Sequence, residues 1–300
     1  MKLYSTHKSN NAVANLYHES AESLASSLAP NSIDLIVTSP PYFVGKEYDV
    51  SKSWEDFRAE ILKVTPLLLK ALKPGGSICW QVGNHVQNGE VTPLDALLVV
   101  DMKSFPAITL RNRIIWTFGH GTHASKRFSG RHETILWYTK GKKSFFNLDN
   151  FRVPQKYPGK RHYKGPKKGK LSGNPLGKNP GDVWDLAEIW KIPNVKAKHI
   201  EKTSHPCQFP TALIRRLIKG LTPENATVLD PYVGSGSAGV AALLEHRNFI
   251  GCDISSKYIE IAKQRLTSVT LGNAEIREDI PIRVPNPNEK VSMRPSHFVA

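Results

Sequence analysis

Short apolar runs alternate with amphipathic helical segments along most of this 300-residue chain, and this alternation constrains the fold more than any other feature. The run Asp34-Leu35-Ile36-Val37-Thr38 is typical of the predicted strands. Strands of a parallel sheet are covered on both faces and read as continuous, β-branched runs of this kind. The order strand, helix, strand, helix therefore predicts an α/β fold with a mainly parallel sheet.

The predicted elements follow from these runs and from capping signals. Predicted strands cover residues 13–20, 34–38, 77–82, 110–118, 132–140, 226–230 and 249–254. Predicted helices cover residues 22–30, 53–72, 92–104, 209–221, a segment after the glycine loop near 234, and 255–266. Ser53, Thr92 and Ser255 are the expected N-caps, with Pro93 at a first helical position. We expect strands 110–118 and 132–140 to form a hairpin, and the final 34 residues to form a strap or a disordered tail.

Positive charge is concentrated in one segment. The chain has a net charge of +15, and from Lys140 to Lys202 it carries 16 Lys or Arg residues against five Asp or Glu residues. This segment is rich in Gly and Pro, which predicts an irregular insertion at 141–203. Clustered cations of this kind mark a surface that binds a polyanion. The interleaved aromatic residues favour nucleic acid over a merely solvated loop; they are Phe145, Phe146, Phe151, Tyr157, Tyr163, Trp184 and Trp190.

Composition argues against several other classes of protein. No apolar run approaches the ~20 residues that span a membrane, and the N-terminus lacks the apolar core of a secretory signal. Cys79, Cys207 and Cys252 are scattered, which indicates a reducing cytoplasm rather than a disulfide framework. No Cys/His cluster has zinc-binding spacing, so we expect no metal site.

Two prolines end the predicted strand at 34–38, in the sequence Ser39-Pro40-Pro41-Tyr42. Proline has no N–H and a fixed φ, so strand pairing stops there. Carbonyls near Ser39 and Pro40 then point outward at the carboxyl end of the strand, where open α/β sheets bind ligands. With the Ser39 hydroxyl and the Tyr42 ring, these acceptors suit a flat heterocycle that carries an amino group. A plain proline turn is the alternative.

A glycine-containing turn follows the predicted strand at 226–230. Gly234 and Gly236 let the backbone approach a ligand closely, and the next helix presents free N–H groups. The following strand ends in Asp253, where an acid accepts both hydroxyls of a ribose in dinucleotide-binding folds. The turn lacks the Lys-Ser/Thr ending of a Walker loop, which argues against an ATPase. A tight turn without a ligand is the alternative.

In this order the motifs resemble those of the β-class amino-methyltransferases of DNA, which use S-adenosyl-L-methionine. Members carry a catalytic (D/N/S)PP(Y/F) motif in the N-terminal half and the cofactor loop near the C-terminus, with the target-recognition region between them. Ser39–Tyr42 resembles the first motif, and Asp230–Ser237 resembles the second, with Tyr232 where Phe is common. Further resemblance lies in "NLYHES" (15–20), "RHETILWYTKG" (131–141) and "HPCQFPTALIRRLI" (205–218), so that it covers roughly residues 13–266.

The resemblance implies a Rossmann-like, mainly parallel, seven-stranded sheet with a permuted motif order. It divides the chain into a catalytic half (1–140), a target-recognition insertion (141–203), a cofactor-binding half (204–270) and a tail (271–300). The implied catalytic residues are Ser39, Pro40, Pro41 and Tyr42. The implied cofactor-binding residues are Glu19, Thr38, Phe209, Asp230, Tyr232, Gly234, Gly236 and Asp253. The cations of the insertion that we expect to bind DNA are Lys142, Lys143, Lys160, Arg161, Lys164, Lys167, Lys168 and Lys170.

Pro206-Cys207-Gln208 mimics the nucleophile motif of cytosine-C5 methyltransferases, which need a thiolate. In those enzymes the motif follows the cofactor loop, whereas here it precedes it, and the partner motif Glu-Asn-Val is missing. We therefore expect Cys207 to be a substitution near the methionine end of the cofactor.

In the family, Ser at the first motif position is typical of N4-cytosine enzymes and Asp of N6-adenine enzymes. We therefore expect Ser39 to mark a site-specific N4-cytosine methyltransferase of duplex DNA, with an N6-adenine enzyme as the alternative. The expected setting is a restriction–modification system in the cytoplasm, with a protein of prokaryotic or phage origin, a separate endonuclease, and a monomeric or homodimeric enzyme. A non-catalytic DNA-binding protein and an RNA target remain open.

Overall fold

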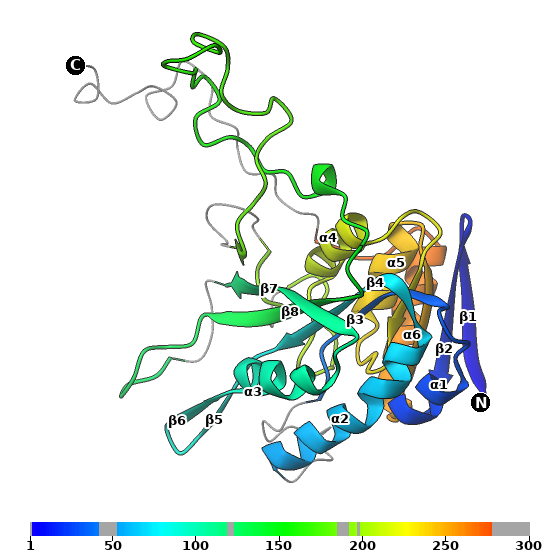
Figure 1. Ribbon diagram of the computed structural model, residues 1–300. Coiled ribbons are helices and arrows are strands. Elements are labelled where there is room, and N and C mark those ends of the chain that lie inside the picture. The colour runs from blue at the N-terminus through cyan, green and yellow to red at the C-terminus, as the bar shows by residue number, and fades with distance from the viewer. Residues whose placement is uncertain (1, 42–52, 119–122, 185–191, 197–198, 278–300) are drawn as a thin grey trace.

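A nine-stranded sheet, in the order β1-β2-β11-β10-β3-β4-β8-β7-β9, runs through the centre of the computed structural model (Figure 1). The structure describes residues 2–41, 53–118, 123–184, 192–196 and 199–277. The strands are β1 (Leu3–Ser9), β2 (Ala12–His18), β3 (Ile33–Thr38), β4 (Leu72–Val82), β5 (Asn84–Gln87), β6 (Glu90–Pro93), β7 (Ile108–Thr117), β8 (His132–Lys140), β9 (Val183–Trp184), β10 (Thr227–Asp230) and β11 (Asn248–Asp253). The helices are α1 (Ala21–Ser27), α2 (Trp54–Ala71), α3 (Leu94–Asp101), α4 (Thr211–Leu221), α5 (Ser237–Leu244) and α6 (Ser256–Thr270), with 3-10 turns η1 (Met102–Ser104) and η2 (Leu148–Asn150).

The sheet is mainly parallel, as the alternating pattern predicted. Strands β2, β11, β10, β3 and β4 run parallel to one another, and β8 pairs antiparallel with both β4 and β7. These seven strands are the predicted ones. The described residues add an edge strand on each side, β1 and β9, which the pattern missed because β1 is polar and half-exposed and β9 has two residues.

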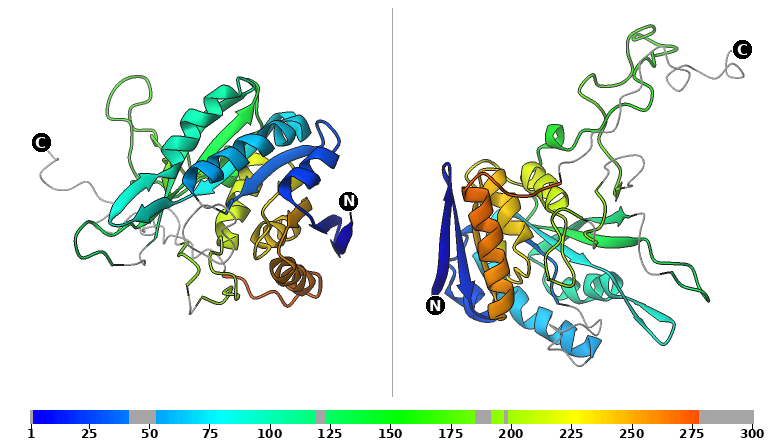
Figure 2. Two further views of the ribbon diagram at one scale, coloured as in Figure 1. Left: turned by 90° about the horizontal axis from the view of Figure 1, so that it is seen from below. Right: turned by 180° about the vertical axis from the view of Figure 1, so that it is seen from behind.

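Helices cover both faces of the sheet (Figure 2). Helices α1, α2 and α3 pack on one face in one hydrophobic cluster, and α4, α5 and α6 pack on the other face in a second cluster. Strand β3 supplies both clusters, because Leu35 and Val37 face one side and Ile36 faces the other. All three side chains are fully buried, which explains the continuous apolar run in the sequence.

Several predicted element boundaries differ from the structure; strand β4, for example, begins at Leu72 rather than at residue 77. Thr92 lies in strand β6 and Pro93 is the N-cap residue of α3, because the chain first forms the hairpin β5-β6. Helix α6 continues to Thr270 and begins at the predicted cap, since the Ser255 hydroxyl accepts a hydrogen bond from Tyr258 N. No helix in the described part of the chain is long and apolar enough to cross a bilayer.

The insertion carries little regular structure in its described part, and its base is packed against the sheet. Phe151, Val153, Trp184 and Ile192 are buried in the same cluster as α4 to α6. Trp116 Nε1 on β7 donates to the Ile192 carbonyl at 2.9 Å. Beyond this base the insertion projects away from the sheet, as Figure 1 shows at the top.

Candidate functional site

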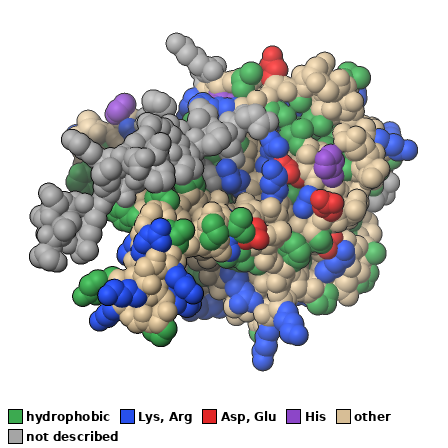
Figure 3. Space-filling view, turned by 90° about the horizontal axis from the view of Figure 1, so that it is seen from above, with side chains coloured by type: hydrophobic (Ala, Val, Ile, Leu, Met, Phe, Trp, Pro, Cys, Tyr) green, Lys and Arg blue, Asp and Glu red, His purple; other side chains and the backbone are tan. Residues whose placement is uncertain are grey.

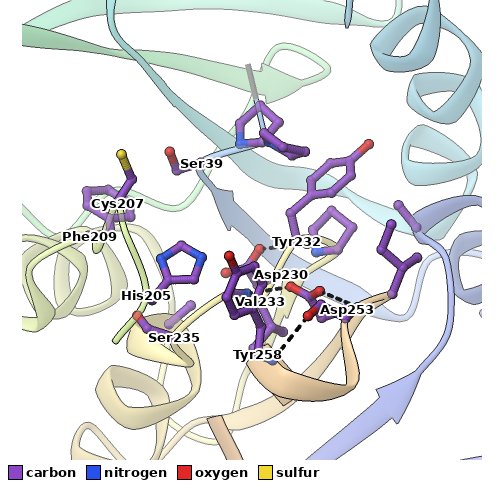
Figure 4. Close-up of a pocket in the computed structure, with 18 of the residues that line it drawn as sticks. Ser39, His205, Cys207, Phe209, Asp230, Tyr232, Val233, Ser235, Asp253 and Tyr258 are labelled. Carbon is purple, nitrogen blue, oxygen red and sulfur yellow. Dashed lines mark hydrogen bonds between the residues drawn. The ribbon is translucent and has the colours of Figure 1, made fainter. Parts of the chain in front are cut away.

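A cavity of about 790 Å³ opens at the carboxyl ends of four neighbouring parallel strands (Figure 4). Its walls come from Glu19 after β2, Ser39 to Pro41 after β3, the loop 230–235 after β10, and Asp253 at the end of β11. Open α/β sheets bind ligands in this position because loops diverge there to either face. The topology therefore brings together segments that lie more than 200 residues apart in the sequence.

The loop between β10 and α5 is shaped by two glycines in the left-handed region, for different reasons. Gly234 has φ +50°, and a Cβ there would lie 2.9 Å from His205 Nε2. Gly236 has φ +79°, and a Cβ there would lie 2.8 Å from Ala262 Cα on α6. Gly234 lines the cavity, whereas Gly236 is not among the lining residues. The structure shows that Gly236 lets helices α5 and α6 approach closely, while contact of its backbone with a cofactor stays a prediction.

Asp253 closes one side of the cavity and organises its loop. One carboxylate oxygen accepts from Gly234 N at 2.9 Å, and the other accepts from Ser255 N at 2.8 Å. Burial raises the pKa of Asp253, while the two backbone hydrogen bonds oppose that rise. Each oxygen keeps a further lone pair, so the carboxylate can still accept hydrogen bonds from a ligand.

Asp230 ties the ends of strands β3 and β10 together. Its Oδ1 accepts from Thr38 Oγ1 at 2.6 Å and from Tyr232 N at 3.0 Å. Burial raises the pKa of Asp230 to about 7. Thr38 is fully buried and is not among the residues that line the cavity, so it acts on the cavity through Asp230.

Three more predicted cofactor residues line the cavity. Glu19 follows β2, and its Oε2 accepts from Ser23 Oγ on α1 at 3.1 Å. Tyr232 is largely buried, and its hydroxyl has no hydrogen-bond partner within the described residues. Phe209 is half-buried against the main core cluster. Glu19 and Phe209 thus face the same space from elements on opposite sheet faces.

Ser39, Pro40 and Pro41 lie on the side of the cavity away from Asp253. Figure 4 shows Ser39 beside Cys207, with Asp253 across the cavity. Tyr42, the fourth residue of the predicted catalytic motif, lies outside the described residues. The cavity therefore has two ends, one near Ser39 and one near Asp253.

His205 and Tyr258 line the cavity, and the sequence assigned no role to either residue. Their rings meet edge to face with centroids 4.5 Å apart. Burial lowers the pKa of His205 to about 4, so its ring is neutral at neutral pH. His205 belongs to the "HPCQFP" segment, which could have marked it, whereas nothing in the sequence marks Tyr258 in the first turn of α6.

Helix α2 adds two acids to the cavity wall, Asp56 and Glu60. The sequence suggested only a capping role for the first turn of this helix, and Ser53 Oγ does accept from Asp56 N at 3.1 Å. Helix α2 packs against α1 and β4, and this position brings its first turns to the cavity. Hydrophobic periodicity in the sequence identifies the buried face of such a helix, but it does not identify which residues beside that face line a cavity.

A buried ion pair holds the segment that carries His205. Glu201 Oε2 accepts from Thr211 Oγ1 at 2.5 Å and from Arg265 Nη2 at 3.3 Å. Arg265 Nη1 also donates to the Ser235 carbonyl at 2.9 Å, so the same cation supports the glycine loop. Groups buried in such a network are costly to separate, which fixes the wall of the cavity.

The predicted DNA-binding cations lie outside the cavity. Lys142 and Lys143 are exposed at the start of the insertion, and the others are exposed on its projecting part. There, His162 N donates to the Lys170 carbonyl at 2.9 Å and Gly169 N donates to the His162 carbonyl at 2.8 Å, which forms a hairpin-like turn. Figure 3 shows Lys and Arg side chains gathered on the projecting lobe.

The structure describes six aromatic residues of the insertion; two of them, Phe151 and Trp184, are buried, and the other four, Phe145, Phe146, Tyr157 and Tyr163, are exposed. The ring of Phe146 stacks on the rings of Trp137 and Phe151, with ring centroids 5.5 Å and 5.3 Å apart. These rings attach the insertion to the sheet. Tyr163, at 79% exposed, remains available to a ligand, and Trp190 lies outside the described residues.

Comparison with known proteins agrees with this arrangement of fold and cavity. A family model described as DNA methylase matches residues 33–264. Type II methyltransferase M.BglII of Bacillus subtilis is 43% identical over 253 residues, which cover 84% of this chain and 68% of that protein. DNA adenine methyltransferase YhdJ of Escherichia coli (strain K12) is 29% identical over 270 residues, which cover 88% of this chain and 86% of that protein.

Two solved structures share the architecture. The PvuII DNA methyltransferase (cytosine-N4-specific) gives a TM-score of 0.67 at 17% identity, covering 90% of this chain and 95% of the other. A DNA modification methylase of Thermus thermophilus, in complex with S-adenosyl-L-methionine, gives a TM-score of 0.60 at 25% identity. The match covers 86% of this chain and 96% of the other. The likeness to the first structure concerns the fold alone.

Proposed function

This chain belongs to the DNA methylase family of N6 and N4 methyltransferases, and from that premise we propose that it methylates the exocyclic N4 of cytosine in duplex DNA. The methyl donor is S-adenosyl-L-methionine. The observation that carries the proposal is that one cavity joins the Ser39 motif to the loop of Gly234 and Asp253. A methyl donor at one end and an amine at the other end would then meet inside it.

The residues near Asp253 fit such a cofactor. Asp253 is held by two backbone N–H groups with lone pairs to spare, which suits the hydroxyls of a ribose. The loop at Gly234 leaves backbone where a side chain would otherwise stand. Glu19 lies at the end of the neighbouring strand, where an acid can meet an adenine amino group. When bound, the cofactor supplies a methyl group on a reactive sulfonium.

The residues near Ser39 fit the base. The exocyclic amine of cytosine is a poor nucleophile because its lone pair is delocalised into the ring. Ser39 Oγ and the Pro40 carbonyl accept hydrogen bonds from its two hydrogens, which favours a lone pair directed out of the ring plane. From the resemblance of the motif, Tyr42 would stack on the base. Catalysis by positioning and electrostatics is then sufficient, with the base flipped out of the duplex.

The choice of cytosine rests on Ser39. Serine at this position resembles the N4-cytosine members of the family. An N6-adenine enzyme is the second candidate, because the relative YhdJ is named a DNA adenine methyltransferase. The relative M.BglII is named a Type II methyltransferase, which supports a role as the modification enzyme of a restriction–modification system.

Methyl transfer to purified nucleic acids tests this function. The protein is incubated with methyl-labelled cofactor and unmethylated plasmid DNA, with RNA as a parallel substrate, and label should enter DNA. Ser39→Ala should slow transfer roughly a hundredfold or more, with the dissociation constant of the cofactor unchanged. Ser26→Ala, on the exposed side of α1, is the matched control. Label in RNA alone, or in neither polymer, would contradict the proposal.

A further inference from the structure

The described part of the turn between β7 and β8, residues 123–131, has no part in the cavity. The strands pair as far as Thr117 and His132, and Phe118 N donates to the Arg131 carbonyl at 2.9 Å. Ala124 N donates to Ser129 Oγ at 3.1 Å within the turn. The described tip, residues 123–131, is therefore a shaped turn at the end of a paired stem.

Phe128 stands at this tip with 99% of its side chain exposed. Of the large hydrophobic residues in the described part of the chain, none is more exposed, and Tyr163 follows at 79%. A phenylalanine in water forgoes about 1.5–3 kcal/mol that burial would contribute. Folding stability therefore does not explain a phenylalanine at this position.

Cations surround Phe128, and acids are missing from the turn. Lys126 and Arg127 precede it and Arg131 follows it, while the sequence from 119 to 132 has no Asp or Glu. Arg127 Nη1 donates to the Phe128 carbonyl at 3.0 Å, which holds the guanidinium of Arg127 close to the backbone of Phe128. A turn with an apolar side chain at its tip and only cations beside it complements duplex DNA, because DNA carries negative phosphates outside and an apolar base stack inside.

The turn leaves the same edge of the sheet as Ser39. Strand β3 is parallel to β4, and both β4 and β7 are antiparallel to β8, so β7 ends on the side where β3 ends. Three strand separations lie between β3 and β7, which makes about 14 Å across the sheet. Figures 1 and 2 show the turn projecting beyond the sheet at this edge.

We propose that Phe128 is an apolar wedge that enters the DNA stack close to the base held at Ser39, while Lys126, Arg127 and Arg131 neutralise neighbouring phosphates. This inference rests on the proposed function. Apolar side chains inserted between base steps unstack and kink DNA, and opening the stack near the target lowers the cost of flipping its base.

Methylation rates of paired and pre-opened substrates test the wedge. The recognised sequence is first read from methylated plasmid DNA. Oligonucleotides with that sequence then carry either the normal partner of the target base or an abasic position opposite it. Phe128→Ala should slow methyl transfer to the paired duplex roughly tenfold to a hundredfold, and most of this loss should be recovered on the abasic duplex. Phe128→Trp should keep the wild-type rate on both.

Leu271→Ala is the matched control, because Leu271 is 70% exposed and follows α6, away from this edge. It should leave both rates unchanged. The affinity of Phe128→Ala for the cofactor should equal that of the wild type, which shows that the variant is folded.

Two results would overturn the wedge alone. In one, Phe128→Ala matches the wild type on the paired duplex. In the other, it loses rate equally on both duplexes, as a general loss of contact with DNA or with a partner protein would cause. A wild-type protein that transfers no methyl group to either duplex contradicts the proposed function itself, and the wedge fails with it.

Discussion

Asp230 and Asp253 end adjacent strands, and burial raises the pKa of both carboxyl groups, yet they have different surroundings. Asp230 also lines the cavity, but it accepts from a buried hydroxyl and from a single backbone N–H. Asp253 accepts from backbone N–H groups on either side and faces the cavity. The first residue is thus suited to joining strands, and the second to holding a ligand.

Replacing Asp253 by alanine should weaken cofactor binding. Each charge-assisted hydrogen bond contributes roughly 1.5–3 kcal/mol, so loss of one alone should raise the dissociation constant at least tenfold. Calorimetric titration of the cofactor measures this change. Glu90→Ala, on the exposed hairpin β5-β6, removes an acid elsewhere and should change nothing. An unchanged constant for Asp253→Ala would rule out the ribose assignment.

Asp230 should make stability depend on pH in the cofactor-free protein. Its pKa is about 7 in the folded state against 3.8 ordinarily, so between these values the folded state holds a proton that the unfolded chain has released. The free energy of unfolding should therefore fall as pH rises through this window, by at most about 1.4 kcal/mol per pH unit, and level off above it.

Asp230→Asn keeps an acceptor for Thr38 and Tyr232 but does not titrate. Urea unfolding should be measured at about pH 5 and about pH 8. The free energy of unfolding of the variant, relative to that of the wild type, should be higher at the higher pH. If the difference in the free energy of unfolding between variant and wild type is the same at both pH values, burial does not raise the pKa of Asp230 as the structure indicates.

The sequence predicted the residues at strand ends better than those on neighbouring elements. Ser39, Gly234 and Asp253 were predictable because a strand, a turn and the next strand fix their positions by spacing alone. Tyr258 was not, and His205 was marked only by the resemblance of its segment "HPCQFP", because both residues reach the cavity only after a loop and a helix have packed beside it. Local patterns contain no information about such packing.

At the scale of elements, helix α5 depends on Gly236, its N-cap residue, which also leaves room for Ala262 of helix α6. Gly236→Ala forces a side chain to φ +79° and places its Cβ 2.8 Å from Ala262 Cα. Gly272 has φ +73° with open space around it, so Gly272→Ala isolates the conformational cost, about 1–2 kcal/mol. Urea midpoints should show Gly236→Ala to be the more destabilised variant. Equal losses would mean that the contact with α6 relaxes freely.

Helices and central strands were predictable from periodicity, and the remaining elements were not. Strand β1 reads Leu-Tyr-Ser-Thr-His-Lys-Ser and is mostly exposed, so no apolar pattern marks it. The aromatic residues of the insertion suggested stacking on bases, yet Phe151 packs into the space beside Gly220 of α4. Composition shows that aromatic residues are present, but only the tertiary fold determines which of them are covered.

For the whole molecule, the uneven charge predicts salt-dependent binding of DNA. Lys167, Lys168 and Lys170 are exposed on the projecting part of the insertion. Changing all three to Gln should weaken binding to every sequence alike and flatten the slope of log K against log salt by up to about 2.7, at about 0.9 per phosphate. The methylated base should stay the same, because the base is held at Ser39.

The matched control changes three other exposed lysines, Lys8, Lys70 and Lys103, to Gln. Lys70 and Lys103 precede strands β4 and β7 and therefore lie at the edge of the sheet opposite the cavity. This control removes the same charge and should keep the wild-type slope. If both triple variants keep that slope, the lysines of the insertion only solvate it, and the DNA-binding surface lies elsewhere.

The central claim is that the cavity at Ser39 methylates the exocyclic amine of cytosine. Mass spectrometry of nucleosides from plasmid DNA that the purified protein has methylated tests this claim most directly. We predict N4-methylcytosine as the single new nucleoside, missing from DNA treated with Ser39→Ala. N6-methyladenine would contradict the assignment of the base, and 5-methylcytosine would contradict the mechanism, because that product requires attack by a thiolate on the ring.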